Sequence, residues 1–423
     1  MRSLFATLAA LAFLVAPSQG EELKPFRTDA DGAVNVVVKI PGAPPSKKGE
    51  DVLKWYQVEA GVFPPEGSAH AISGELVWID HLERRFHLRV DRNDSQDRGV
   101  WDLCVDATML PYGSIYYHGS PAALQDIPVG THLHGLFYQR PADDKTQPPA
   151  ANNNRKTPEF EFGRCFRLED DFSFRARQQQ LWKIESVDLA AKKLTAVLLD
   201  QGKSPGDKAV GKPQLFDLTS ATVVYDGQGF ADHAALKPGQ TVLFNLTWVT
   251  LYGPGRITDI WLDAKARDLA TARQLEKHRN HIRERGLAGW VDEVDDERQI
   301  VTITFFGGVD PSLFDDLVGI PLDSLLVNSV APLDKVKDAR GGLAVARESL
   351  MTYDPVNDRK SGPVVGVERV PVQPGSSGVR IRVQPDMLLE GYRPKKIVRY
   401  YPAFPTVWPV VALPREEQYF GRE

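Results

Sequence analysis

Apolar and polar residues alternate with a period of two in three segments of the chain, and the three segments share one design. They are residues 75–90, 181–199 and 288–306. In each, an apolar strand ends in an aspartate (Asp80, Asp188 or Asp295), a polar turn with basic residues follows, and a second alternating strand returns. Aspartate suits such a turn because its carboxylate accepts a nearby backbone N–H. The pattern predicts three β-hairpins.

Each hairpin opens a longer repeat. The stretch "WDLCVDATMLPYG" resembles "QLFDLTSATVVYDG", and "DIPVGTHLHGLFY" resembles "ALKPGQTVLFNLTW". The third copy is lengthened by an insertion, residues 310–378, rich in Gly, Pro and Asp. Four or five short strands in ~70–100 residues suit a small closed barrel of the OB type. The predicted fold class is mainly all-β, with three tandem OB-like β-barrels and one connecting α-helix.

Over residues 74–401 the pattern resembles the OB-like β-barrel repeats of uncharacterised secreted bacterial proteins. The resemblance implies the OB-like fold but no activity, because these families have no assigned activity. Residues 264–286 are rich in Ala, Leu, Arg, Gln and Glu and end at Gly286, which predicts the connecting helix. The expected organisation is a signal peptide (1–20), an extension (21–67), barrel 1 (68–140), a Pro/Asn-rich linker (141–168), barrel 2 (169–263), the helix (264–286), barrel 3 with its insertion (287–413) and a tail (414–423).

The first twenty residues indicate export. Arg2 precedes an apolar run, and Ser18 and Gly20 supply the small side chains that precede a signal-peptidase cleavage site. The run of roughly 12 apolar residues is too short to span a bilayer. We therefore expect a periplasmic or secreted chain with no transmembrane segment after cleavage. Its net charge of −5 gives no general attraction to nucleic acid, and no nucleic-acid partner is predicted.

The chain has two cysteines, Cys104 and Cys165. In an oxidising compartment they are candidates for a disulfide bond. The alternative is a pair of separate buried thiols, because Cys104 lies within a strand-like run. The sequence leaves both states open.

The segment "THLHG" places His132 and His134 one residue apart, and they are candidate metal ligands. Aligning Gly130 with Gly239 puts both histidines on the strand face opposite the apolar residues of the repeat. We therefore expect the two side chains on the exposed outer face of barrel 1.

A zinc or copper site needs a third ligand, and His87 or His118 could supply it. Arg85 and Arg89 flank His87 and disfavour a cation there. Histidines that are solvated or packed without metal are the favoured interpretation, and no cofactor is expected. Asp91 opens a loop with carboxylates at calcium-like spacing, but the glycine and helices of a calcium site are missing, which favours a solvated turn.

A second candidate surface mixes cations and aromatic residues near the C-terminus. Its members are Tyr392, Arg393, Lys395, Lys396, Arg399 and Tyr401. Such strands on OB barrels bind single strands and sugars, and an anionic glycan is the expected target if this strand binds a ligand. The favoured interpretation is an edge strand whose basic residues discourage aggregation. On the connecting helix, His278 and His281 are expected to lie on a solvated face.

Phosphate-loop, Rossmann, HExxH and paired CxxC patterns are missing from the sequence. The favoured function is therefore a non-enzymatic binding or scaffolding protein of the cell envelope or secreted space. The sequence does not identify its ligand or partner, and an envelope glycan or an envelope protein is a candidate. Two alternatives stay open. One is a metal-binding accessory protein that uses the histidines of barrel 1, and the other is an envelope-polymer hydrolase with unidentified carboxylates.

Overall fold

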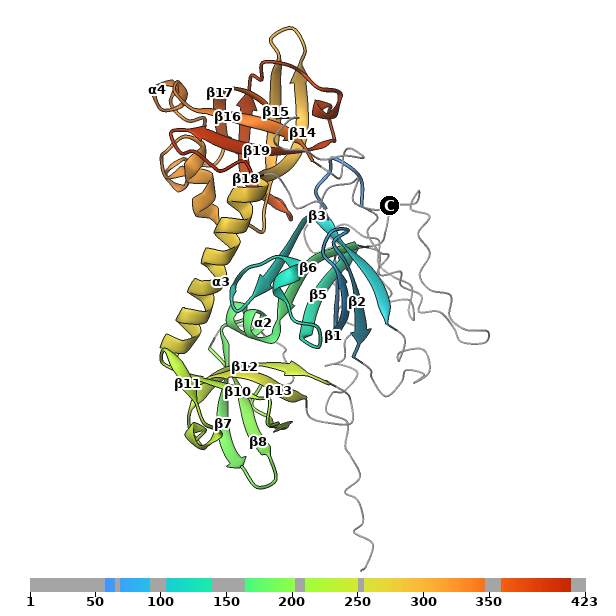
Figure 1. Ribbon diagram of the computed structural model, residues 1–423, viewed down its shortest axis with the longest axis vertical. Coiled ribbons are helices and arrows are strands. Elements are labelled where there is room, and N and C mark those ends of the chain that lie inside the picture. The colour runs from blue at the N-terminus through green and yellow to red at the C-terminus, as the bar shows by residue number, and fades with distance from the viewer. Residues whose placement is uncertain are drawn as a thin grey trace, which may run out of the picture.

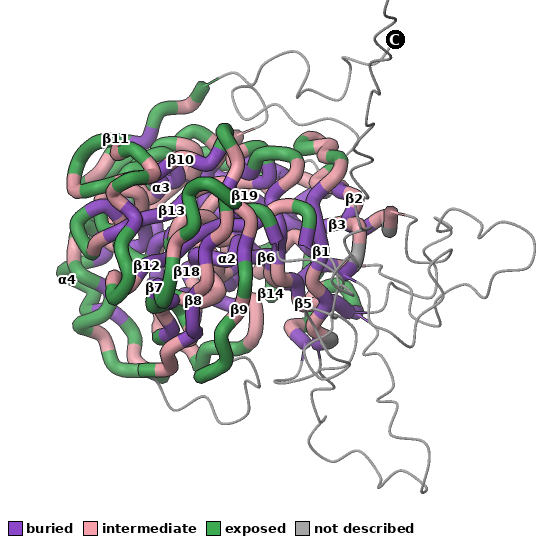
Figure 2. Tube along the Cα trace, turned by 90° about the horizontal axis from the view of Figure 1, so that it is seen from below, coloured by how far each residue is buried: buried purple, intermediate pink, exposed green. Residues whose placement is uncertain are grey.

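The described part of the chain forms three closed β-barrels, which confirms the predicted fold class (Figure 1). The computed structural model describes residues 58–64, 69–91, 104–138, 164–201, 210–249, 255–346 and 359–411. The predicted signal peptide, most of the extension, most of the linker and the tail lie outside these residues. Buried residues run along the strands of each barrel, and exposed residues concentrate in turns such as those around α4 (Leu333–Val336) (Figure 2).

Barrel 1 has the strand order of an OB barrel. Its wall runs β1 (His70–Asp80), β2 (Arg85–Val90), β3 (Val105–Tyr117), β6 (Arg164–Asp170), β5 (His132–Tyr138) and back to β1. All pairs are antiparallel except β3 with β6. The sequence prediction ended barrel 1 at residue 140 and placed most of β6 in the linker, which is wrong. The gap between β3 and β5 needs one more strand, and the chain returns from the linker to fill it.

Barrel 2 repeats this order. Its wall runs β7 (Gln180–Asp188), β8 (Lys193–Asp200), β9 (Pro213–Asp217), β13 (Arg256–Trp261), β12 (Thr241–Thr247) and back to β7. Two short strands, β10 (Val223–Asp226) and β11 (Gly229–Ala231), extend the sheet beyond β13. The pairing of β9 with β13 is parallel, as in barrel 1. The two barrels are therefore copies of one fold.

Barrel 3 closes with six antiparallel strands instead of five. Its wall runs β14 (Leu287–Asp295), β15 (Ile300–Phe306), β18 (Ser376–Val383), β17 (Lys360–Arg369), β16 (Arg340–Val345), β19 (Ile397–Phe404) and back to β14. The segment interpreted as an insertion, residues 310–378, supplies β16 and β17. These two strands fill the position that the fifth strand holds in barrels 1 and 2, so the insertion is part of the wall.

The three predicted hairpins are confirmed, and so is their shared turn. The Asp80 Oδ1 atom accepts hydrogen bonds from the backbone N–H groups of Leu82 and Glu83. Asp188 and Asp295 each accept one from the residue three positions on, at 2.8 and 2.9 Å. A β-bulge interrupts the first strand of each hairpin at the same position of the repeat. The copies therefore match in detail.

A second shared turn precedes β5, β12 and β19. The backbone N–H groups of Gly130 and Gly239 donate to carbonyls of the first strand of their barrels, both at 2.7 Å, and Lys395 does so at 2.8 Å. The φ angles at these positions are +97°, +91° and +70°. The structure thus confirms the alignment of Gly130 with Gly239. It also shows that Lys395 adopts a left-handed conformation that glycine accepts more easily.

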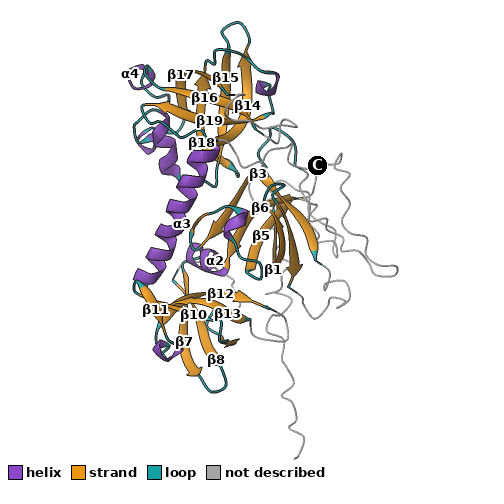
Figure 3. Ribbon diagram, viewed as in Figure 1, coloured by secondary structure: helices purple, strands orange, loops and turns teal. Residues whose placement is uncertain are grey.

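The connecting helix is confirmed as α3 (Ala264–Arg285), and it does more than connect (Figure 3). It leaves barrel 2, runs beside barrel 1 and enters barrel 3. Midway along it, the Thr271 Oγ1 atom donates to the His118 carbonyl, and the Thr271 carbonyl accepts from the Ser120 hydroxyl, both at 2.8 Å. Barrel 1 therefore lies against the helix that joins the other two. Within the described residues, no helix is both long enough and apolar enough to cross a membrane.

Barrels 1 and 3 share an apolar joint. The ring of Tyr112 on β3 lies 6.1 Å from that of Trp290 and 6.0 Å from that of Phe306, both of barrel 3. Phe166 of β6 packs into the same cluster. The barrels are thus held together by buried aromatic side chains.

The two cysteines are separate thiols. Cys165 is buried in the core of barrel 1 and pairs with Met109 across the parallel strands β3 and β6. Cys104 lies five residues before Met109, about 16 Å along an extended chain. A disulfide bond needs Cα atoms within about 7 Å, so of the two states left open by the sequence, the structure has the unbonded one.

Candidate functional site

Two histidines on β5 form the centre of a buried polar cluster. As predicted, His132 and His134 lie on the strand face opposite Leu133 and Phe137, which are in the barrel core. The expectation that they are exposed is wrong, since His132 is 0% exposed and the His134 side chain 14%. The reason is that the outer face of β5 is covered by helix α2 (Asp171–Arg177) and by barrel 2 (Figure 1).

Hydrogen bonds join the histidines to two carboxylates. The His132 Nδ1 atom lies 2.9 Å from Asp171 Oδ1, and its Nε2 atom lies 2.8 Å from Asp91 Oδ2. The His134 Nε2 atom lies 2.9 Å from the same Asp171 oxygen. The second oxygen of Asp171 accepts the backbone N–H of Leu246 at 3.0 Å. Every described side chain of the cluster is therefore held in a fixed orientation.

The first turn of α2 places Asp171 in the cluster. Asp170 caps the helix, since its Oδ1 atom accepts the backbone N–H of Ser173 at 2.8 Å. Asn245 of β12 clamps the same turn: its side-chain amide donates to Asp170 Oδ2 at 2.8 Å, and its carbonyl oxygen accepts the N–H of Phe172 at 2.9 Å. Barrel 2 thus fixes the helix whose first residue reaches the histidines of barrel 1.

Burial and charge set the protonation of the cluster. Burial alone would lower the pKa of His132, but the charges of Asp171 and Asp91 outweigh it and raise that pKa to about 9. Burial lowers the pKa of His134 to about 4, which Asp171 only partly opposes. Burial also disfavours ionised Asp171, yet His132 holds its pKa below the ordinary value. At neutral pH His132 is a cation between two carboxylates, and His134 is neutral.

One side of the cluster reaches the surface. The His134 ring stacks on Phe174 of α2, with ring centroids 3.9 Å apart and planes 12° apart. Arg175 and Arg177 lie over the same phenyl ring. His134 is the most exposed member of the cluster, so a ligand would enter beside Phe174.

The other two predicted metal ligands do not join this cluster. His87 packs on Trp78, with ring centroids 4.5 Å apart. His87 on β2 pairs with Trp78 of β1, whereas His132 on β5 pairs with Glu75 of β1. The two histidines therefore lie on opposite sides of β1 and three residues apart along it. His118 lies in the turn after β3 and stacks on Tyr117. Among the described residues, the convergent set of potential ligands is His132, His134 and Asp171.

The charged C-terminal surface is divided by the fold. Tyr392 and Tyr401 are both 0% exposed, and their hydroxyls donate to the backbone carbonyls of Leu343 and Arg285. They offer no aromatic face to a sugar, because both rings belong to the packing of barrel 3. Of the cations, Lys395 and Lys396 are exposed and Arg393 pairs with Asp296 at 2.7 Å. The sixth residue, Arg399, lines a cavity between barrels.

Sequence reasoning missed Asp171 and misread Asp91. The signal for α2 is present, because Asp170 and Ser173 have the spacing of an N-cap and its partner. No local pattern indicates that Asp171 meets the histidines, since barrel 2 brings the two together. Asp91 was interpreted as part of a solvated turn, but it is 3% exposed and binds His132.

The fold and the site define a tandem-barrel protein with ionisable side chains gathered at the joints between barrels. The chain matches no family model and no curated protein sequence. Among solved structures it is similar to a copper(II)-bound CusF variant from Escherichia coli, with 20% identity, 20% of this chain and 89% of that chain covered, and a TM-score of 0.15. Silver(I)-bound CusF gives 20% identity, 20% and 95% coverage and the same TM-score.

Proposed function

We propose that this chain is an exported binding protein that takes up one divalent transition-metal ion, zinc or copper(II), between barrels 1 and 2. The observation that carries the proposal is the convergence of His132, His134 and Asp171, whose ligand atoms all lie within 4.8 Å of one another. Imidazole nitrogen with carboxylate oxygen is a ligand set that suits both metals. Export is supported by the pattern of the first twenty residues.

The groups behind the three ligands support the same function. Metal-bound histidines characteristically donate their second ring N–H to a carboxylate, which fixes the ring. Asp91 stands in that position toward His132, at 2.8 Å. The second oxygen of Asp171, Oδ2, is fixed by the backbone N–H of Leu246. Binding would need only a small adjustment, since ligands on a tetrahedral ion are roughly 3.3 Å apart and the present contacts to Asp171 are 2.9 Å.

The charge balance also favours a divalent cation. Asp91 and Asp171 are buried, and the positive charge of His132 lies between them. Buried carboxylates need positive charge or hydrogen bonds close by. When His132 loses its proton to bind a metal, a divalent ion replaces that positive charge and exceeds it by one.

The test is metal titration of protein purified without an affinity tag and stripped with a chelator. We expect one equivalent of zinc or copper to bind. A His134→Ala variant should lose binding. An Asp91→Asn variant, which removes the carboxylate behind His132, should lose roughly 10- to 100-fold in affinity. His87→Ala removes a histidine of the same barrel outside the cluster and should bind as the unaltered protein does.

Circular dichroism must show that each variant is folded. Two results would overturn the proposal. One is a chain that binds neither zinc nor copper at one equivalent. The other is binding that survives unchanged in both His134→Ala and an Asp171→Asn variant.

A further inference from the structure

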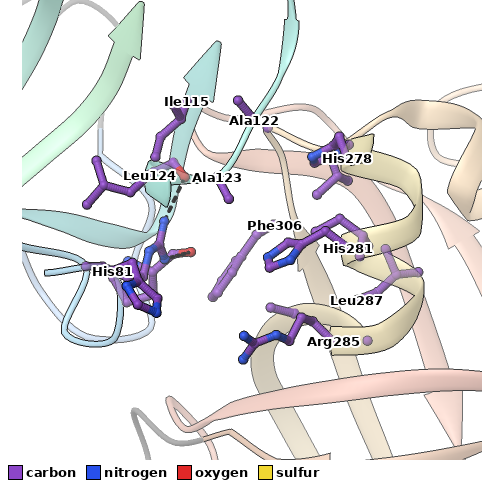
Figure 4. Close-up of a pocket in the computed structure, with 18 of the residues that line it drawn as sticks. His81, Ile115, Ala122, Ala123, Leu124, His278, His281, Arg285, Leu287 and Phe306 are labelled. Atoms are coloured by element: carbon purple, nitrogen blue, oxygen red, sulfur yellow. Dashed lines mark hydrogen bonds between the residues drawn. The ribbon is translucent and has the colours of Figure 1, made fainter. Parts of the chain in front are cut away.

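A groove of about 520 Å³ lies on the outer face of barrel 3. Its floor is formed by β14, β15, β18 and β17, which are neighbours in the barrel wall. The rest of its lining comes from residues 61–63, from residues 328–330 and from the loop that joins β17 to β18. Its volume is usual for a ligand site, which measures roughly 300–1,000 Å³. Among the described residues, it shares none with the cavity between barrels 1 and 3, into which the Phe306 ring is directed (Figure 4).

A row of polar side chains crosses the floor of the groove. Thr304 of β15 pairs with Arg380 of β18, which pairs in turn with Glu368 of β17. Successive side chains of a strand point to opposite faces of the sheet. The row therefore points outward, because the neighbouring residues on the three strands belong to the barrel core: Ile303, Ile381 and Val367.

Asp292 joins this row from β14. It is the extra residue of the β-bulge in that strand, and a bulge can redirect a side chain. The Thr304 hydroxyl donates to Asp292 Oδ2 at 2.6 Å. The Arg380 Nε–H donates to the same carboxylate oxygen at 3.0 Å and to the Thr304 hydroxyl at 3.1 Å. Thr304 is buried, so its hydroxyl holds a carboxylate and a guanidinium group side by side in fixed positions.

Part of this carboxylate and part of this guanidinium group have no partner. Among the described residues, no hydrogen bond reaches Asp292 Oδ1 or the two Nη atoms of Arg380. The Nη1 atom lies 3.9 Å from Glu368 Oε2, which is too far for a hydrogen bond. The side chains of Asp292 and Arg380 are 30% and 34% exposed, so a ligand can reach both. The floor therefore presents a fixed acceptor beside fixed donors.

Water competes only partly for these groups. Burial raises the pKa of Asp292, against the hydrogen bonds from Thr304 and Arg380, which lower it. The carboxylate is thus partly shielded from solvent, although a ligand can still reach it. A hydrogen bond that a ligand makes there is stronger than the same bond on an open surface.

The charges along the groove balance. Among the described residues that line it, two are acids, two are arginines and none is Lys or His: Asp292, Glu368, Arg369 and Arg380. Outside the groove, Arg382 pairs with Glu368 and Asp323 pairs with Arg369, so these contacts balance as well. The remaining polar lining residues are uncharged: Thr304, Asn328, Ser329, Gln373 and Ser376. An ionic ligand would meet a like charge beside each opposite one, so the groove favours a neutral polar ligand.

The shape of the floor disfavours an extended peptide. A peptide that adds a strand to a sheet needs an unpaired edge, and every strand of barrel 3 is paired on both sides because the barrel is closed. The groove offers side chains instead. Val62 and Val330 add aliphatic surface that is 41% and 58% exposed. Sugar rings suit such a lining, because their hydroxyls both donate and accept hydrogen bonds and their C–H groups pack on aliphatic side chains.

We propose that this groove binds a neutral oligosaccharide through neighbouring hydroxyls of one sugar ring. One hydroxyl donates to Asp292 Oδ1, and the oxygen of the next accepts from the Arg380 guanidinium group. The C–H groups of the sugar pack against Val62 and Val330. The site is independent of the metal site between barrels 1 and 2, and it contains none of the residues of the charged C-terminal surface.

Isothermal titration of the full chain with three neutral trisaccharides tests the proposal: maltotriose, cellotriose and triacetylchitotriose. The comparison ligands are the acidic trigalacturonate, the basic triglucosamine and an uncharged tripeptide with blocked ends. The protein is treated with a chelator, so that no bound metal contributes. We expect one neutral trisaccharide per chain, with an affinity that hardly changes as salt is raised, because the ligand has no charge to screen. The charged trisaccharides and the peptide should bind more weakly.

Variants of the floor should weaken binding of the same trisaccharide. Asp292→Ala and Arg380→Gln should each lower the affinity roughly tenfold or more, because each removes hydrogen bonds to a charged group. Thr304 is a positioning residue: Thr304→Val, which removes its hydroxyl, should also lower the affinity, and Thr304→Ser, which keeps it, should not. Arg298→Gln is the matched control for Arg380→Gln, because Arg298 belongs to the same barrel and lies outside the groove.

Circular dichroism must show that each variant is folded. Three results would overturn the proposal. None of the three neutral trisaccharides binds, a charged trisaccharide or the peptide binds as tightly as the best neutral one, or Asp292→Ala and Arg380→Gln both bind normally.

Discussion

The clamp between Asn245 and Asp170 gives a prediction whose size follows from the structure. Asn245 is 1% exposed, and its amide donates to Asp170 Oδ2 at 2.8 Å. In an Asn245→Asp variant the shape is kept, and the oxygen that accepts the N–H of Phe172 remains. The donor is replaced by a carboxylate oxygen that faces Asp170 directly.

Two responses are open to the folded variant, and the cheaper one sets the cost. If both carboxylates stay ionised at this distance, their repulsion is about 6 kcal/mol at an effective dielectric constant of about 20. If one takes up a proton instead, the new O–H restores the lost hydrogen bond. At pH 7, protonating a carboxyl group with an ordinary pKa of about 3.9 costs about 4 kcal/mol, at about 1.4 kcal/mol per pH unit. Burial already raises the pKa of Asp170 in the unaltered protein, which makes its protonation less costly. We therefore expect a loss of at most about 4 kcal/mol in the free energy of unfolding.

The same reasoning fixes the pH dependence. The carboxyl pair has a pKa raised above its unfolded value, so the penalty is small near pH 4 and grows as pH rises. Urea unfolding should give a loss of at most about 1.5 kcal/mol at pH 5 and a larger loss, up to about 4 kcal/mol, at pH 7. Asn280→Asp, at an exposed position of α3, should change stability by less than about 0.5 kcal/mol at either pH. An equal loss for Asn245→Asp at both pH values would refute the reasoning.

Other positions give predictions of the same kind. Lys395 has a left-handed backbone conformation at the position where the other copies have glycine. Lys395→Gly relieves about 1–2 kcal/mol of backbone strain but adds conformational entropy to the unfolded chain. The free energy of unfolding should therefore rise by about 0.5 kcal/mol. The reverse change, Gly239→Lys, should lower it by about 1 kcal/mol, and urea unfolding that shows equal signs for the two changes would contradict the argument. For the cysteines, burial raises the pKa of the Cys165 thiol and leaves it enclosed, so a thiol reagent should label Cys104 quickly and Cys165 only on unfolding. Fewer than two thiols in unreduced, unfolded protein would show that a disulfide had formed.

Much of the fold was predictable because its signals are local. The turns at Asp80, Asp188 and Asp295 depend on residues at most three positions away, and the strand face of His132 follows from a period of two. Barrel 3 was predicted less well. Its fifth position is filled by β16 and β17, which come from a segment with no counterpart in the other copies, and strand pairing over that distance leaves no local pattern.

The candidate metal site was less predictable because it lies between domains. The period of two correctly predicted that His132 points away from the barrel core. A side chain on the outer face of a barrel is nevertheless buried when a second barrel covers that face, as it is here. Its partner Asp171 lies 39 residues further along the chain. His278 was expected on a solvated helix face and is buried against barrel 1 and barrel 3 for the same reason. Repeats indicate each barrel, but not which faces of the barrels meet.

The contact of barrel 1 with the middle of α3 has a thermodynamic consequence. Three domains with separate cores ordinarily unfold as separate cooperative units. Here Thr271 of α3 is hydrogen-bonded to the turn after β3 of barrel 1, while the two ends of α3 connect to barrels 2 and 3. Melting any one barrel removes partners from the helix and, through it, from the other two. We therefore expect the contacts between the barrels, more than the individual cores, to couple the three barrels so that they unfold in a single transition.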